Sequence, residues 1–244
     1  MLKNLSLLKK LNLKNLVISF TPTEENIDDL PNLPRFAYEN NIDAIHITRL
    51  MPVGRGKDMK KPLEINSEIY STNFRKFVDN FNKIIEVIKI DNELNISKRN
   101  LISLTFSGDQ TYKVAYRQRK MTCGAGLGSM SINFDGKIYP CASLQNTKFS
   151  FGTIDDEVSK VIRNAQDFMK EVSVERLPGC KDCKLKYMCG GGCRACAYAF
   201  SGNEDIYASD PMCERYKKEM IELIWILDRP VVNKADISEN PVGK

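Results

Sequence analysis

Seven of the eight cysteines in this chain form an ordered pattern that could hold metal. In chain order they are Cys123, Cys141, Cys180, Cys183, Cys189, Cys193 and Cys213. The middle four are spaced as Cys-x2-Cys-x5-Cys-x3-Cys, and the only histidine, His46, lies far from them in sequence. A metal would therefore be held mainly by sulfur. All-thiolate coordination is typical of iron–sulfur clusters and of structural zinc.

The chain carries no recognisable export or membrane segment. Residues 1–14 mix leucines and lysines at helical spacing and lack an apolar core followed by a cleavage site, so they do not resemble a signal peptide. No apolar run approaches the roughly 20 residues of a membrane-spanning helix. Cytosolic thiols are kept reduced, so the cysteine pattern favours metal over disulfides, and we expect a cytoplasmic protein that does not associate with membranes.

The net charge of +5 is spread along the chain. Lys57, Lys60 and Lys61 form one loose basic cluster, and Arg117, Arg119 and Lys120 form another. No aromatic-and-basic motif accompanies them, so we interpret them as solvated surface and expect no nucleic-acid binding.

The cysteine-rich half contains elements that could gather the thiols. Asp135-Gly136, between strands at 131–134 and 137–139, predicts a hairpin with a positive φ at both turn positions, which would bring Cys123 and Cys141 together. A helix over 155–172 follows. Its predicted buried residues are Val158, Val161, Ile162, Ala165, Phe168, Met169 and Val172.

Two further features of this half involve backbone geometry. The glycine run 190–192 allows the backbone to approach an inorganic group closely and to direct N–H groups at its sulfurs. Asp210-Pro211 resembles a helix start, with Cys213 in the first turn and the helix ending near Leu227.

The cysteine-free half has the pattern of a parallel sheet with crossover helices. The apolar run 16–20 suits a strand buried on both faces. A helix capped by Asn26 and ending near Asn40-Asn41 follows, then a strand over 44–47, a loop over 49–56 and a long helix over 67–89. One face of the long helix carries Phe74, Phe77, Val78, Phe81, Ile84, Ile85 and Ile88, at the spacing of a core-facing stripe.

The cysteine pattern resembles the seven-cysteine signature of the SPASM domain, a C-terminal extension of radical SAM enzymes. The matching segments are Cys123-Gly-Ala-Gly, Asp135-Gly-x-x-Tyr-Pro-Cys141, Phe151-Gly-Thr-Ile and Cys189-Gly-Gly-Gly-Cys-Arg194. The first half is similar to the last strands of a radical SAM barrel, through Thr21 to Asn26 and the Arg49-Leu-Met-Pro-Val-Gly-Arg55 loop. The resemblance implies an α/β chain. Residues 1–110 would be the C-terminal part of a partial (β/α) barrel, 111–228 a small SPASM domain with a hairpin and helices, and 229–244 a polar tail.

The resemblance also implies two auxiliary 4Fe-4S sites, of which one or both could be filled. One would use Cys180, Cys183, Cys189 and Cys213, and the other Cys123, Cys141 and Cys193. The second set has three matching cysteines, so its site would either be open at one iron or take another ligand. Cys196 is the spare cysteine, which is either that ligand or a small buried residue.

One departure from the family is clear. In radical SAM enzymes a Cys-x3-Cys-x2-Cys triplet near the first strand holds the cluster that cleaves S-adenosylmethionine, and the cysteine-free residues 1–122 contain no such triplet. The same spacing occurs once, at Cys189, Cys193 and Cys196, inside the SPASM-like pattern. We therefore expect the C-terminal portion of such an enzyme, whether truncated, split or excised. It would be inactive alone and would need a complementary N-terminal chain to use S-adenosylmethionine. A sheet cut partway leaves an edge strand, so a partner chain, self-association or a covering helix is expected there.

Three functions follow as hypotheses. The first is part of a radical SAM/SPASM oxidoreductase that modifies a peptide or protein substrate, with clusters that transfer electrons or bind substrate. The second is a standalone iron–sulfur electron-transfer module. The third is a zinc-stabilised interaction domain.

A few residues outside the cysteine pattern have alternative interpretations. We interpret His46 as a packed residue rather than a ligand, and Trp225 as packing or interface. Arg49 and Arg55 could face a nucleotide cofactor or an acidic substrate at a strand end, or could be solvated surface.

Overall fold

The computed structural model describes residues 15–49, 65–97, 99–106, 120–126 and 128–223, together with residues 4, 5, 7, 8 and 13. The chain divides into two compact units. One comprises 1–49, 72–107 and 222–244, and the other comprises 50–71 and 108–221. Several predicted features lie outside the described residues. They are the loop residues 50–56, which include Arg55, the basic cluster of Lys57, Lys60 and Lys61, the cluster residues Arg117 and Arg119, Trp225, and the tail 229–244. Of the two basic clusters, Lys120 is described.

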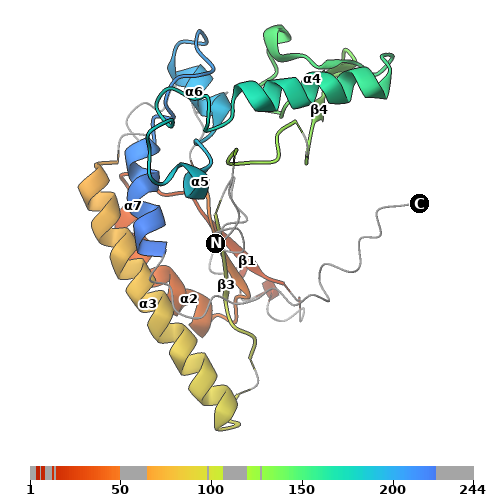
Figure 1. The fold of residues 1–244 in the computed structure, drawn as a ribbon. Coiled ribbons are helices and arrows are strands. Elements are labelled where there is room, and N and C mark those ends of the chain that lie inside the picture. Colours follow the sequence, from red (N-terminus) through yellow and green to blue (C-terminus); the bar gives the residue numbers. More distant parts are fainter. Residues whose placement is uncertain are drawn as a thin grey trace. The chain divides into compact units, whose positions relative to one another are not determined.

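The first unit contains a three-stranded parallel sheet, which confirms the α/β fold (Figure 1). Its order is β1 (Val17–Phe20), β2 (Ala44–Ile47) and β3 (Ser103–Phe106). The sequence prediction missed β3, although Ile102, Leu104 and Phe106 alternate at strand period and are all buried.

The sheet differs from expectation at its edge. Val17 in β1 is 57% exposed, and no residue of β1 is fully buried, so the prediction of burial on both faces is wrong for this strand. In β2, Ile45 and Ile47 are buried, whereas His46 on the opposite face is half-buried and pairs through Nδ1 with the Thr105 hydroxyl at 2.7 Å. His46 is therefore packed within the sheet.

The helix predicted after β1 is divided in two. A 3-10 helix (η1, Ile27–Asn32) precedes α2 (Leu33–Glu39). Asn26 is the N-cap residue of η1, as predicted by position, but its side chain makes no capping bond. Its side-chain oxygen accepts from the Thr23 N–H at 2.7 Å, and its amide donates to the Thr21 carbonyl at 3.0 Å. Pro31, which has no N–H to donate, accounts for the interruption. The predicted end near Asn40-Asn41 is confirmed, with Asn40 as C-cap and Asn41 at a φ of 52°.

The long helix α3 (Ser67–Glu93) confirms the predicted apolar stripe and ends four residues later than expected. Phe74, Phe77, Phe81 and Ile88 are fully buried, and the Phe74 and Phe106 rings lie 5.9 Å apart, which joins helix and sheet. This stripe supplies the largest side chains of the unit's core, the three fully buried phenylalanines.

Trimming this core by one methylene should have a measurable effect. We expect Ile85→Val to lower the free energy of unfolding by about 0.5–1.5 kcal/mol, because Ile85 is buried and the lost methylene leaves a void. Ile90→Val on the exposed side of the same helix is the matched control, with an expected change within about 0.5 kcal/mol. Urea denaturation of both variants checks this, and equal losses would contradict the packing.

The second unit opens with a small antiparallel sheet of β4 (Ser131–Ile132), β5 (Lys137–Tyr139) and β6 (Gly152–Thr153). The predicted hairpin is confirmed, but its turn is of another kind. Gly136 has a φ of 78°, whereas Asp135 has no positive φ, and the Gly136 N–H donates to the Asn133 carbonyl at 2.9 Å. This pattern suits a four-residue turn ending in a left-handed glycine.

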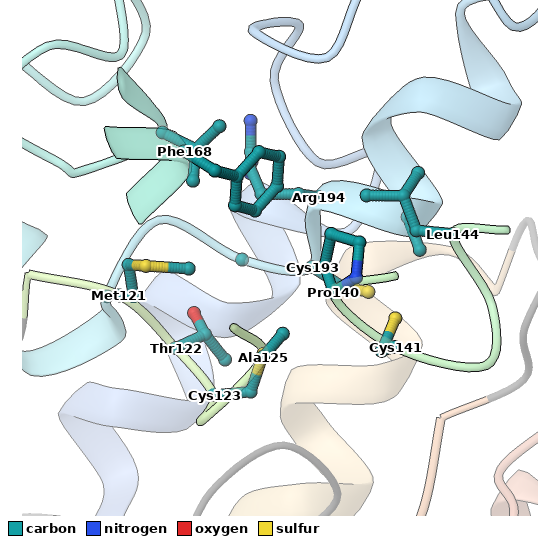
Figure 2. A pocket seen from close by; sticks show the side chains of 14 residues that line it. Met121, Thr122, Cys123, Ala125, Pro140, Cys141, Leu144, Phe168, Cys193 and Arg194 are labelled. Carbon is teal, nitrogen blue, oxygen red and sulfur yellow. The ribbon is translucent and has the colours of Figure 1, made fainter. Parts of the chain in front are cut away.

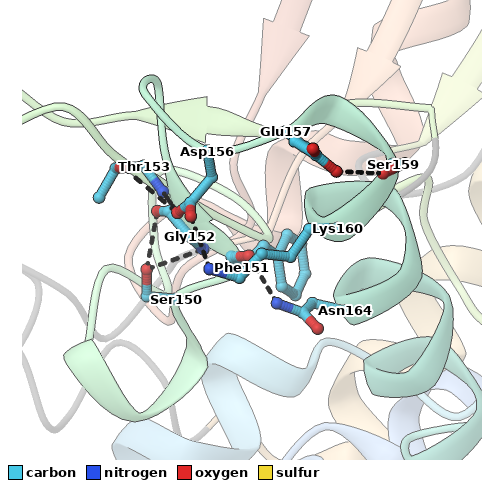
Figure 3. A network of polar contacts seen from close by, with 9 residues as sticks. All are labelled: Ser150, Phe151, Gly152, Thr153, Asp156, Glu157, Ser159, Lys160 and Asn164. Carbon is cyan, nitrogen blue, oxygen red and sulfur yellow. Dashed lines mark hydrogen bonds and ion pairs between the residues drawn. The ribbon is translucent and has the colours of Figure 1, made fainter.

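After η5 (Thr147–Phe149) and β6, the chain turns into α4 (Val158–Glu171). Figure 3 shows the corner, where Asp156 accepts from the Thr153 N–H at 2.8 Å and pairs with Lys160 at 2.5 Å. The helix starts three residues later than predicted. Val161, Ala165 and Val172 are buried as expected, but Val158 is 72% and Ile162 is 42% exposed, so their predicted burial is wrong.

The remaining helices are α5 (Lys186–Cys189), α6 (Arg194–Phe200) and α7 (Cys213–Leu223). A core formed by Leu144, Val172, Ala195, Tyr198 and Ile206 underlies α6. Within the described part of the chain, none of the helices combines the length and apolarity that crossing a membrane demands.

Candidate metal centre

The three-cysteine set lines one cavity. Cys123, Cys141 and Cys193 face it together with Met121, Pro140 and Phe168, and Figure 2 shows the sulfurs of Cys141 and Cys193 turned toward each other. Cys141 directly follows the hairpin, and Cys193 is the N-cap residue of α6. Burial raises the pKa of the Cys141 thiol, and the neighbouring Cys193 and Cys123 raise it further.

The four-cysteine set lines a second cavity. Cys180, Cys183, Cys189 and Cys213 all face it. Burial raises the pKa of Cys189 to about 11, with smaller contributions from Cys213 and Cys180. Burial is also the main reason why the pKa values of Cys180 and Cys213 are raised. The raised pKa values favour the protonated thiols of Cys180, Cys189 and Cys213, so a metal must displace these protons when it binds.

The glycine run lines both cavities and has a left-handed backbone throughout. Gly190, Gly191 and Gly192 have φ values of 72°, 86° and 72°. The N–H groups of Gly191 and Gly192 hydrogen-bond the Cys189 sulfur and partly offset the effect of burial on its pKa. A Cβ on Gly190 would lie 2.5 Å from the backbone of Met121 and Thr122, so only glycine permits this approach.

The predicted helix start at Asp210 has a second role that the sequence did not reveal. Asp210 Oδ1 accepts from the Met212 N–H at 2.8 Å, just before α7, and Oδ2 accepts from the Cys193 N–H at 2.6 Å. The neighbouring Arg194 is buried and donates to the carbonyls of Gly191, Ile206 and Ala208. Asp210 lies 17 residues from Cys193, and Ile206 lies 12 residues from Arg194, so no local sequence pattern predicts these bonds. The bond from Arg194 to the Gly191 carbonyl depends on the fold of the glycine run.

Donor chemistry in both cavities fits a thiolate-bound metal group. Each set of thiols shares one cavity, and Arg194 at the first has a buried Nε donor with no acceptor in the described part of the chain. Among described residues, no three His, Cys, Asp or Glu side chains are close enough to hold a single ion. Cys196 is buried on α6 and lines neither cavity. Of the two interpretations of this cysteine, its position agrees with a small buried residue rather than a metal ligand.

A wider hollow of about 650 Å³ lies beside the three-cysteine cavity. Met121 and Cys123 line both. Lys120, Lys170 and Arg176 also line the hollow, and they form ion pairs with Glu175, Asp167 and Glu171. These pairs are exposed and therefore weak, so the cations remain accessible to another anion. Arg49 is half-buried at the end of β2 in the first unit.

Comparison with known proteins agrees with this geometry. The sequence profile of the SPASM family, an iron-sulfur cluster-binding domain, matches residues 123–184. An AdoMet-dependent heme synthase from Methanosarcina barkeri is 25% identical over 204 residues, covering 80% of this chain and 55% of that protein. Residues 123–184 are thus similar to the iron-sulfur cluster-binding SPASM domain, and the chain is similar to proteins of the radical SAM/SPASM family.

Two further relatives cover less of this chain. A probable GTP 3',8-cyclase from Sulfurisphaera tokodaii is 33% identical over 125 residues, covering 46% of this chain and 40% of that protein. An uncharacterized protein from Archaeoglobus fulgidus is 27% identical over 110 residues, covering 44% of this chain and 26% of that protein. The chain thus spans from about a quarter to just over half of these relatives.

Solved structures show the same fold. Native anSMEcpe with bound AdoMet superposes with a TM-score of 0.55 at 18% identity, covering 91% of this chain and 58% of that one. The same enzyme with bound AdoMet and Cp18Cys peptide gives the same TM-score, covering 59% of that chain. This likeness confirms the α/β fold class predicted from sequence.

Proposed function

We propose that this chain is the cluster-binding part of a radical SAM enzyme that modifies a peptide or protein, with 4Fe-4S clusters held by its two cysteine sets. The observation that carries the proposal is the partition of seven cysteines between two cavities. Cys193 faces one and Cys189 the other, although only three glycines separate them. Sequence proximity alone would have placed both in one site.

The chain's own residues would hold the clusters and set their surroundings. When bound, such clusters supply electron transfer, with potentials of roughly −700 to +450 mV that hydrogen bonds and exposure set. The N–H groups of Gly191 and Gly192 already point to the Cys189 sulfur, and the surrounding burial excludes water. Hydrogen bonds to sulfur stabilise negative charge there and so favour the reduced cluster.

The substrate side of the proposal rests on the surface hollow beside Cys123. Its volume of about 650 Å³ and its accessible cations suit a peptide segment with acidic or polar groups. The peptide bound in the solved anSMEcpe complex is a precedent in a relative. S-adenosylmethionine would be used with a complementary N-terminal radical SAM segment, carried by a partner chain or by a longer protein.

The proposal places the protein in the cytoplasm, because thiolate-bound clusters persist in a reducing compartment.

A zinc-stabilised domain is the second candidate, since four cysteines are also the ligand set of many structural Zn²⁺ sites. The thiols of the described residues would have to draw closer together to bind one Zn²⁺. Metal analysis separates the two. Anaerobic reconstitution with iron and sulfide should give about four irons and four sulfides per occupied site. A chain that takes up zinc instead, with no absorbance near 400 nm, would contradict the iron–sulfur proposal.

Two cysteine variants test the assignment of ligands. We expect Cys189→Ala to remove the iron of the four-cysteine site, because Cys189 is one of its four thiols. Cys196→Ala is the matched control, a buried cysteine that lines neither cavity, and it should retain all the iron of the unaltered chain. Iron content and absorbance of both variants check this. Full iron in Cys189→Ala, or loss in Cys196→Ala, would overturn the assignment.

A further inference from the structure

The segment from Cys189 to Cys193 contributes one thiol to each cavity, so the two sites share a backbone. Asp210 strengthens this connection from another part of the chain. It is 4% exposed, and its two carboxylate oxygens bond different segments. Oδ2 accepts from the N–H of Cys193, a residue of the three-cysteine cavity, at 2.6 Å. Oδ1 accepts from the N–H of Met212 at 2.8 Å, and Met212 precedes Cys213 of the four-cysteine cavity.

The approach of Asp210 to the glycine run is close. A Cβ on Gly192 would lie 2.5 Å from the Asp210 Cβ, so the carboxylate reaches Cys193 only because residue 192 is glycine. The Cys213 N–H also donates to the Asp210 carbonyl at 2.9 Å, which ties the first turn of α7 to the same residue. The buried Asp210 side chain thus connects the backbone of Cys193 to the backbone that leads into Cys213.

Arg194 fixes the opposite side of this junction. It is 7% exposed and follows Cys193 directly. Its guanidinium donates to the Gly191 carbonyl and, at 2.8 Å, to the Ala208 carbonyl two residues before Asp210. The glycine run and the loop leading to Asp210 are thus held against each other by two buried side chains of opposite charge.

We propose that Asp210 is a positioning residue that couples the two sites, so that a cluster in one favours a cluster in the other. This inference rests on the proposed iron–sulfur function. A cluster bound to Cys193 orders the Cys193 backbone and, through the carboxylate, the start of α7. The second site then loses less conformational entropy when Cys213 binds its own cluster. The coupling is reciprocal by thermodynamic linkage.

Native mass spectrometry of the full chain, reconstituted anaerobically with limiting iron and sulfide, tests this directly. It counts chains that hold zero, one and two clusters. Coupled sites deplete the one-cluster species. We expect the ratio of (zero × two) to (one × one) populations to be about tenfold higher in the unaltered chain than in Asp210→Asn, a typical coupling strength. An asparagine has a single side-chain carbonyl oxygen, so it accepts from the Met212 N–H or from the Cys193 N–H, whereas the aspartate accepts from both.

Asp156→Asn is the matched control. Asp156 also accepts a backbone N–H, from Thr153 at 2.8 Å, within the same compact unit, but it contacts no cysteine segment. Its ratio should equal that of the unaltered chain. Equal ratios in the unaltered chain and in Asp210→Asn, or independent loading in both, would overturn the coupling while leaving the proposed function intact. No cluster in any chain would instead reject the proposed function.

A second variant covers the case in which Asp210→Asn loses its fold by circular dichroism. Arg194→Lys keeps the charge but cannot bridge the carbonyls of Gly191, Ile206 and Ala208 at once. We expect a smaller decrease of the same ratio. An unchanged ratio in a folded Arg194→Lys would contradict the coupling.

Discussion

Gly190→Ala should dismantle the three-cysteine cavity. The added Cβ would lie 2.5 Å from the backbone carbon of Met121 and the backbone nitrogen of Thr122, and backbone cannot move aside as a flexible side chain can. The residue also holds a φ of 72°, which costs a non-glycine residue about 1–2 kcal/mol. Overpacking adds about 1–3 kcal/mol. We expect a combined loss of roughly 2–5 kcal/mol in the free energy of unfolding.

The same change should affect metal more than stability alone implies. The Thr122 hydroxyl donates to the Cys189 carbonyl at 2.8 Å, which holds the segment carrying Cys123 against the glycine run. Separation of these segments withdraws Cys123 from the cavity that it shares with Cys141 and Cys193. The iron content of the chain should therefore fall by the amount that the three-cysteine site binds, while the four-cysteine site retains more of its iron.

Gly202→Ala separates the two causes. Gly202 has a similar φ of 76° but nothing within 4 Å of an added Cβ, so it carries the conformational cost without the overlap. We expect a loss of only about 1–2 kcal/mol and unchanged iron. Urea denaturation and iron analysis of the two variants provide the comparison. Equal behaviour would show that the close approach at Gly190 is not important.

Arg215→Ala should cause the second large loss, because it breaks a buried ionic network. The guanidinium lies 3.7 Å from the centroid of the Tyr70 ring and 3.1 Å from the Glu219 carboxylate, and Tyr70 donates its hydroxyl to Glu219. Burial alone would lower the pKa of Arg215. The interactions with Tyr70 and Glu219 outweigh burial and raise the pKa above its usual value, so the arginine stays charged. Burial, followed by Glu219, raises the pKa of Tyr70, which stays neutral and able to donate.

Glu219 is buried, with 5% of the residue exposed, and removing Arg215 leaves its carboxylate without its cation. We expect this to lower the free energy of unfolding by about 3–5 kcal/mol. Lys218→Ala on the same helix is the control. Its ion pair with Glu68 is more exposed, at 28% and 80% of the two side chains, and should contribute at most about 1 kcal/mol. Thermal and urea unfolding report both losses. If the Arg215 variant were no less stable than the Lys218 variant, the buried network would contribute little.

The sequence alone determined the features that depend on local spacing. Apolar residues at helical period predicted α3, because a face of Phe74, Phe77 and Phe81 must be buried wherever the helix packs. The family resemblance assigned seven cysteines to two sets, and the folded chain brings the same sets into two cavities. Local signals were weaker at boundaries. Pro31 interrupted a predicted helix, and the alternation of Leu104 and Phe106 was too short to distinguish β3 from a loop.

The tertiary structure decided the contacts that join distant segments. Asp210 reaches Cys193 across 17 residues, and Tyr70 reaches Glu219 across 149, where no periodic pattern connects the partners. The exposure of Val158 and Ile162 was decided in the same way, since an apolar helix face is buried only over the length that its neighbours cover. Local chemistry thus indicated which side chains can bind metal. The packing of the chain determined which of them meet, because burial and hydrogen bonding depend on segments that the sequence keeps far apart.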